Sequence, residues 1–383
     1  MTLKKFYNRE RLYTICFILA IFFINYNSYA DIGLSGSTYI ENSLIKNNEG
    51  THYSNRSAIH LQLASLTEGI KMVSEIEFYM IHGYLSSISS ELSELMKNGQ
   101  FYIDRLYMKF PVSKLDLTIG KQRIAWGSAV IFRPTDRLNK PNPLSLSGRK
   151  EGVNAVLAKI FIGDLSSTEF VLAPADTFRY VNNEVNLGRL KYSRFAARFI
   201  TNFMKSDVAN SYYYDGETKD LMIGIDLKGD IKLGYHIEAI LNYNESFKIE
   251  NIRERIQSVF GLDYSFGGKW IILGEYLYNG NGLKSKKELP ASSFYLLDKF
   301  IYRHYIYSQV SYQHDIFFGI SLFTIWNMID KSLIISPGIR YNLFQNADMQ
   351  IYSQMFFGDE SDEYGPKHLG ASRVYNLKLT VKL

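Results

Sequence analysis

A basic stretch between Gly120 and Gly152 holds the side chains best suited to binding chemistry. It reads GKQRIAWGSAVIFRPTDRLNKPNPLSLSGRKEG and contains three prolines, which restrict its backbone. The charged residues that we consider candidate site residues are Arg123, Arg133, Asp136, Arg137, Lys140, Arg149 and Lys150. Guanidinium and ammonium groups on one stiff segment create a local positive potential that attracts anions. This stretch is therefore a candidate binding site if the fold places it beside a solute.

Motifs for catalysis are weak by comparison. The seven histidines are scattered, and the chain has no HExxH pair, no GxSxG elbow and no phosphate-binding loop. A serine or aspartate could still meet a histidine in space, which a sequence does not exclude. We interpret His60, His236 and His304 as members of a wall or of an aromatic belt. We therefore expect no catalytic residues, no cofactor and no metal.

An acidic run, GDESDEYG from Gly358 to Gly365, concentrates four carboxylates. Carboxylates are the ligands that Ca²⁺ prefers, but this run lacks the spacing of a known calcium loop. We expect a solvated external loop.

Composition limits the class of protein. Apolar residues make up 46% of the 383 residues and charged residues 21%, which excludes disorder of the whole chain. The formal net charge of +5 is too small for a dedicated nucleic-acid binder. The aromatic fraction of 15%, mostly Tyr and Phe, is high for a soluble protein.

Residues 1–30 have the pattern of a secretory signal peptide. Four basic residues come before an apolar stretch, Leu12 to Ile24, which is too short to span a bilayer as a helix. Ser28 and Ala30 provide a cleavage site, so we expect the mature chain to start at Asp31. Removal of this segment also removes the one cysteine, Cys16, and changes the net charge from +5 to +2.

The mature chain is dominated by alternation between apolar and polar residues. From Tyr375 to Leu383 every second residue is apolar, which gives a strand one apolar face and one polar face. Repeated segments of this kind, separated by turns, are typical of a transmembrane β-barrel, although a secreted β-sandwich or solenoid also alternates. Long strands, flanking aromatics and a C-terminal strand closing on an apolar residue favour the barrel. We therefore predict an all-β, antiparallel transmembrane barrel as a single domain of residues 31–383.

The connectors predict the number of strands. Short turns, expected on the periplasmic side, occur at residues 111–114, 163–166, 229–230, 267–268, 314–315 and 345–346. Long connectors, expected outside, occur at residues 41–55, 81–100, 124–151, 244–254, 279–302 and 358–370. A direct count gives seventeen strands, with residues 205–220 as a further long connector on the wrong side. Splitting residues 185–204 near Tyr192 gives about eighteen, with sixteen as the alternative.

Three local features refine this picture. Residues 84–96 have apolar side chains at helical spacing, which predicts a short helix in an external loop or a lid over the pore. Pro337 interrupts a good strand, so we expect a bulge there with Gly338. The basic stretch, as the connector of residues 124–151, could fold inward and narrow the pore, or point outward and meet lipopolysaccharide phosphates or solvent.

The basic stretch also carries a resemblance. The run GKQRIAWG at residues 120–127, followed by Pro134-Thr-Asp136 and Asn142-Pro143, resembles a motif of a group of Gram-negative outer-membrane porin-like barrels. The resemblance covers about forty residues, and Lys121 stands where arginine is commoner in that pattern. It implies an outer-membrane barrel with a channel role and no particular substrate. Trp126 could belong instead to the aromatic girdle.

If the apolar face of each strand meets lipid, the opposite residues line the lumen. The candidate lumen-wall cations are Arg105, Lys109, Arg194, Arg198 and Arg340. Acidic lumen residues nearly balance the basic ones, and a register slip of one residue would invert each assignment. The wall alone therefore predicts little selectivity.

We expect a porin-like channel in the bacterial outer membrane for passive diffusion of small hydrophilic solutes, with a weak preference for anions or sugars. The alternatives are a non-conducting barrel in adhesion, envelope assembly or polymer export, and a hydrolase embedded in a barrel. Expected partners are membrane lipid and lipopolysaccharide, the barrel assembly machinery through the C-terminal strand, and two further copies in a possible homo-trimer.

Overall fold

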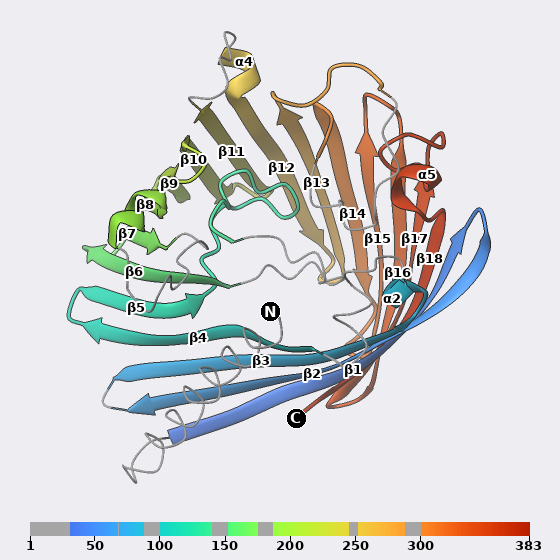
Figure 1. The fold of residues 1–383 in the computed structure, drawn as a ribbon, viewed down its shortest axis with the longest axis horizontal. Helices are drawn as coiled ribbons and strands as arrows, with labels where there is room; N and C mark the ends of the chain where they lie inside the picture. Colours follow the sequence, from blue (N-terminus) through green and yellow to red (C-terminus); the bar gives the residue numbers. More distant parts are fainter. Residues whose placement is uncertain are drawn as a thin grey trace, which may run out of the picture.

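The chain forms one closed antiparallel β-barrel. The computed structural model describes residues 31–67, 69–87, 100–139, 152–174, 187–244, 252–287 and 300–383. These residues form eighteen strands, each hydrogen-bonded to its neighbours in the chain, and β1 pairs with β18 to close the ring (Figure 1). The strands are β1 (Asp31–Asn47), β2 (Gly50–Thr67), β3 (Ile70–Gly83), β4 (Gln100–Val112), β5 (Leu115–Gln122), β6 (Val153–Ile162), β7 (Ser166–Ala173), β8 (Arg194–Phe203), β9 (Ser206–Asp215), β10 (Asp220–Asp230), β11 (Gly234–Asn244), β12 (Ile256–Phe266), β13 (Trp270–Asn279), β14 (His304–Gln313), β15 (Phe318–Asn327), β16 (Leu333–Phe344), β17 (Ala347–Phe357) and β18 (Arg373–Lys382). The predicted fold class and the number of eighteen strands are confirmed.

Alternation gives the barrel its two faces, as β18 illustrates. Tyr375, Leu377 and Leu379 are exposed on the outer face, as an apolar surface in lipid requires. Between them, Lys378 points inward, with its ammonium 4.2 Å from the ring centre of Tyr39 on β1. The alternation at the C-terminal end of the chain therefore forms a membrane-type strand, as predicted.

The predicted division of residues 185–220 is wrong, although the total of eighteen is right. The chain forms β8, a two-residue turn and β9, so residues 205–220 are mostly strand and not a long connector. The region before β8 is a 3₁₀ helix, η1 (Leu187–Tyr192). The turn escapes recognition because Met204 and Lys205 both adopt positive φ, at 50° and 64°, where glycine or asparagine would be expected. In β9 the alternation of apolar and polar residues is blurred, because the same residue type stands on both faces: Tyr212 faces out and Tyr213 faces in.

The predicted connector at residues 41–55 is also wrong. Strands β1 and β2 continue to Asn47 and Gly50, which pair directly across a two-residue turn. The residues of these strand ends are largely polar. Hydropathy therefore stops indicating a strand there, while backbone pairing continues.

The described helices are short. They are α2 (Tyr84–Ser87), α4 (Ile252–Arg255), α5 (Pro366–Leu369) and η1. Among the described residues, no helix is long and apolar enough to cross a bilayer. The short helix expected at residues 84–96 begins as predicted, while residues 88–99 lie outside the described residues.

The bulge predicted at Pro337 is wrong. Pro337 pairs with Leu322 on β15, and the register of β16 with β17 is the same on both sides of the proline. Residues 336 and 337 have no partners on β17. The N–H that proline lacks therefore leaves a gap in the ladder, but no extra residue is inserted as a bulge would require. The register shift lies instead between Asn342 and Phe344, beside the short turn to β17.

Candidate functional site

Residues 123–139, which we call the inward loop, leave β5 and lie inside the barrel (Figure 1, teal). At one end Ile124, Trp126 and Leu138 pack in a buried cluster with luminal residues of β6, β7, β8, β10 and β11. At the other end Phe132 packs against Tyr305 of β14, with 6.3 Å between ring centres. The inward loop therefore contacts walls that are many strands apart.

Two wall carboxylates hold the middle of the inward loop. Glu275 on β13 accepts the backbone N–H groups of Val130, Ile131 and Phe132, the last two at 3.0 and 3.2 Å. Glu238 on β11 accepts the N–H of Ala129 at 2.6 Å. A loop that enters a lumen loses water from its backbone donors, and an anionic acceptor replaces that water well.

The same carboxylates are themselves fixed by neighbours. Glu238 also accepts the Thr135 hydroxyl at 2.7 Å and the Thr135 N–H at 3.3 Å. His236 on β11 reaches Glu275 on β13, with 2.8 Å between Nε2 and Oε1. Gly261 of the intervening strand β12 makes this possible, because a Cβ there would lie 1.9 Å from the imidazole.

Two further side-chain contacts attach the inward loop to the barrel wall. Ser128 donates to Asp226 on β10 at 2.5 Å, and Arg198 on β8 pairs with the other oxygen of Asp226 at 2.9 Å. Trp126 donates its indole N–H to Glu169 on β7 at 3.0 Å and is buried. The interpretation of Trp126 as a girdle residue is therefore wrong.

Replacing Gly127 with alanine should disturb the seat of the inward loop. Gly127 has φ +92°, and an added Cβ would lie 2.6 Å from both Glu238 Oε1 and Thr135 Oγ1. We expect the substitution to destabilise the seated conformation of the loop by about 1–3 kcal/mol. Displacement of the loop would relieve this strain. Single-channel recordings should show a noisier and larger current than wild type. Gly163→Ala is the matched control, since Gly163 also has positive φ but nothing within 4 Å. Identical recordings for both variants would contradict this role.

The structure places the predicted loop residues in different surroundings. Arg123 and Arg137 are exposed, Arg133 is half-buried and Asp136 is buried. Arg133 donates its Nε to the Ala129 carbonyl at 2.8 Å, and Arg137 donates its own to the Pro134 carbonyl at 3.0 Å. The remaining predicted loop residues, Lys140, Arg149 and Lys150, lie outside the described residues.

Asp136 is part of the internal structure of the loop. Its carboxylate accepts the Asn139 amide at 3.1 Å, and Asn139 also bonds both the N–H and the carbonyl of Ile124. Asn139 thus joins the two ends of the described loop.

Four of the predicted wall cations have partners. Arg105 pairs with Glu75 at 2.9 Å, and Lys109 pairs with Asp116 at 2.6 Å. Arg198 pairs with Asp226, as described above, and the buried Arg194 donates to the Leu138 carbonyl of the inward loop at 3.0 Å. The fifth, Arg340 on β16, is exposed on the luminal face.

Sequence reasoning missed the role of the anchors. Asp226, Glu238 and Glu275 can be predicted as acidic lumen residues, but not as acceptors for the inward loop. The pairings join residues 98 to 145 positions apart, and no local pattern marks them.

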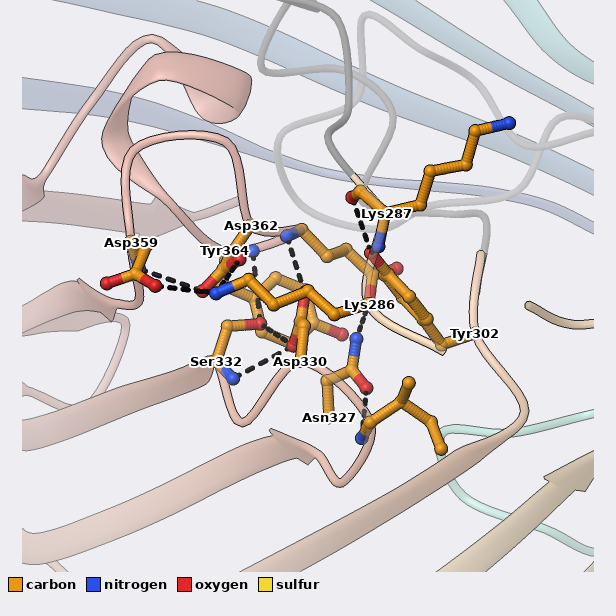
Figure 2. Close-up of polar contacts among 11 residues, drawn as sticks. Lys286, Lys287, Tyr302, Asn327, Asp330, Ser332, Asp359, Asp362 and Tyr364 are labelled. Carbon is orange, nitrogen blue, oxygen red and sulfur yellow. Dashed lines mark hydrogen bonds and ion pairs between the residues drawn. The ribbon is translucent and has the colours of Figure 1, made fainter. Parts of the chain in front are cut away.

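A second polar cluster lies where three connectors meet at the end of the barrel that carries the long loops. Lys286, after β13, reaches Asp359 at 2.5 Å and Asp362 at 2.9 Å in the connector between β17 and β18 (Figure 2). Beside them, Glu363 is buried and accepts the Tyr305 hydroxyl at 2.7 Å and the Asn327 amide at 2.7 Å. The expectation that the acidic run is merely solvated is wrong, because Lys286 and the buried donors stabilise it. The described residues contain no cluster with the makeup of a metal site.

The cluster should loosen as pH rises. Burial raises the pKa of Glu363 to about 7 from an ordinary 4.5, with Asp330 adding repulsion. Protonation of Glu363 therefore stabilises the folded connector. This stabilisation is complete below pH 4.5 and is lost as the pH rises through about 7. The shift in pKa corresponds to a change of about 3 kcal/mol in the free energy of unfolding of the connector. Proteolysis of residues 358–372 should be slower at pH 5 than at pH 8, and Glu363→Gln should remove the difference. Equal rates for the wild type at both values would contradict this assignment.

Among the comparisons with known proteins, only the one with solved structures finds proteins similar to this chain. No family model and no curated protein matches this sequence. Among solved structures, the outer membrane protein opdK from Pseudomonas aeruginosa is similar with a TM-score of 0.60 and 8% identity, covering 92% of this chain and 98% of that one. OccK5 (OpdH) of the same organism gives 0.58 and 9% identity over 91% and 98% of the two chains. OccAB4 of Acinetobacter baumannii gives 0.60 and 6% identity, also over 91% and 98%.

The fold is that of an outer-membrane barrel. At these identities the likeness concerns the whole barrel and not individual side chains. The inward loop and its carboxylate anchors must therefore be interpreted from the chemistry of this chain.

Proposed function

We propose that this chain is a porin-like channel of the bacterial outer membrane, through which small hydrophilic solutes diffuse passively. The observation that carries this proposal is the inward loop, which is fixed inside the barrel by Asp226, Glu238 and Glu275. A barrel of this size encloses a lumen wide enough for water, so a loop fixed within it acts as the constriction.

The charges along the route favour a weak preference for anions or sugars. The carboxylates closest to the inward loop are occupied by its donors and by His236 and Arg198. Two of the loop arginines bond to neutral acceptors: Arg133 to the Ala129 carbonyl, and Arg137 to Asn242 and Gln257. The inward loop therefore adds positive charge where we propose that the passage is narrow, which favours anions.

Location and partners belong to the same proposal. The outer face of β18 and of its neighbours is apolar, which suits membrane lipid and, outside, lipopolysaccharide. We propose that residues 1–30 direct export, that residues 31–383 form the single domain, and that β18 is recognised by the barrel assembly machinery. A homo-trimer is a further prediction from the sequence. No catalytic role is proposed.

Liposome swelling tests the channel directly. The mature chain, refolded into liposomes, should admit small sugars at rates that fall with solute size. Heat-modifiable migration on gels reports that the barrel is folded. A folded barrel whose liposomes do not swell in any sugar would overturn the proposal and favour the non-conducting alternatives.

A further inference from the structure

The outer face of the barrel has a depression that is separate from the lumen. It has a volume of about 460 Å³ and lies over strands β6 to β10. Ala197 on β8 forms its floor, and the residues paired with Ala197 on the neighbouring strands are Phe170 and Tyr212. Both rings are about half exposed, so two large side chains stand on either side of a small one.

The depression lies near the external ends of its strands. Its lining includes Tyr214, next to the end of β9, and Leu221, next to the start of β10. These two residues are paired with each other. The connector above them joins β9 to β10, on the side of the long loops, which is the external side in such barrels. In a membrane the depression therefore faces the external leaflet.

A cation lies at the external edge of the depression. Lys219 donates from Nζ to the Tyr214 hydroxyl at 3.4 Å, and its ammonium is 5.9 Å from the ring centre. Lys191 of η1 is on the adjacent segment, which is held beside the β9–β10 connector by the bond from Gly216 N–H to the Ser193 carbonyl at 3.0 Å. Lys219 therefore stands at the external rim, and Lys191 lies on the segment beside it, with its ammonium 4.9 Å from the ring centre of Tyr192.

Two of the three nearby carboxylates, Asp215 and Asp220, are directed away from the outer face. Asp215 accepts the hydroxyl of the luminal Tyr213 at 3.1 Å and caps its own turn. Asp220 has the same parity in β10 as the buried, luminal Met222 and accepts the Thr218 hydroxyl at 2.7 Å. Glu217 is the acidic residue left at the exposed tip of the connector.

We propose that this depression binds one acyl chain of a phosphorylated glycolipid of the external leaflet, with the phosphate at Lys219 and Lys191. An apolar floor between aromatic rings suits an acyl chain, and ammonium groups at the rim complement a phosphate. We call it the lipid groove. The inference rests on the outer-membrane location proposed above, but it does not depend on conduction through the lumen.

Native mass spectrometry of the refolded mature barrel with lipid A tests the lipid groove. Wild type should retain one lipid A, and Ala197→Leu should bind about tenfold more weakly, because leucine fills the floor. Ala239→Leu is the matched control, since Ala239 faces outward on β11, away from the groove. Replacing Lys191 and Lys219 with glutamine should weaken binding of lipid A and leave binding of its dephosphorylated form unchanged. Lys205→Gln combined with Lys232→Gln, at two turns on the opposite side of the membrane, controls for the loss of two positive charges.

Several outcomes would overturn the proposal. One is equal binding by wild type and Ala197→Leu. Another is equal loss in Ala239→Leu. A third is a dimer in analytical ultracentrifugation that Ala197→Leu abolishes, which would assign the depression to a second copy. Swelling assays on the same samples report the channel separately, so failure of the lipid groove and failure of the proposed function are distinguishable.

Discussion

Replacing both Glu238 and Glu275 with glutamine should raise the single-channel conductance by about twofold or more, because the inward loop would lose its anchors. Together the two carboxylates accept five backbone N–H groups and the Thr135 hydroxyl. A bond to a charged acceptor contributes about 1.5–3 kcal/mol, and a glutamine amide places N–H groups where acceptors are needed. The loop should then leave its seat and widen the passage.

The control for this pair is Asp116→Asn combined with Asp348→Asn. It removes the same charge from the luminal wall, but Asp116 pairs with Lys109 and Asp348 accepts from Gln350, so neither contacts the inward loop in the described structure. Planar-bilayer recordings should therefore show a large change for the glutamate pair and a small one for the aspartate pair. Unchanged conductance in the glutamate pair would mean that the carboxylates do not hold a constriction.

Replacing Arg123, Arg133 and Arg137 with glutamine should abolish any preference for anions. Three positive charges would leave the narrow part of the passage, where the local field acts most strongly on a passing ion. The reversal potential in a salt gradient should move toward the value of a non-selective pore. The effect should be greatest at low ionic strength, because salt screens the field.

The matched variant replaces the same three arginines with lysine. Lysine keeps the charge but cannot keep the Nε bonds of Arg133 and Arg137 to the loop carbonyls. Selectivity should therefore persist in the lysine variant while the current becomes noisier. If the glutamine variant keeps the wild-type reversal potential, the field-setting residues lie elsewhere, for example at Arg340.

The fold could be predicted well because a membrane barrel imposes alternation on every strand. The errors fall where that rule weakens. The ends of β1 and β2 are largely polar and still paired, and β9 has tyrosines on both faces. Its turn uses Met204 and Lys205 in a conformation typical of glycine, so no residue type marks it.

The candidate site could be predicted only in part. Composition identifies a stiff basic connector, but the same residues suit an external loop equally well. Its position depends on donors and acceptors that come together only when the barrel closes, such as Val130 with Glu275, 145 residues apart. It also depends on Gly261, whose lack of a side chain lets His236 reach across a strand.

The most direct test of a channel narrowed by the inward loop is a planar-bilayer recording of the refolded mature chain, residues 31–383. We expect stable, small conductance steps with a reversal potential that leans toward anions, because a basic loop narrows the lumen. A barrel that is folded by heat-modifiable migration but passes no current would contradict it.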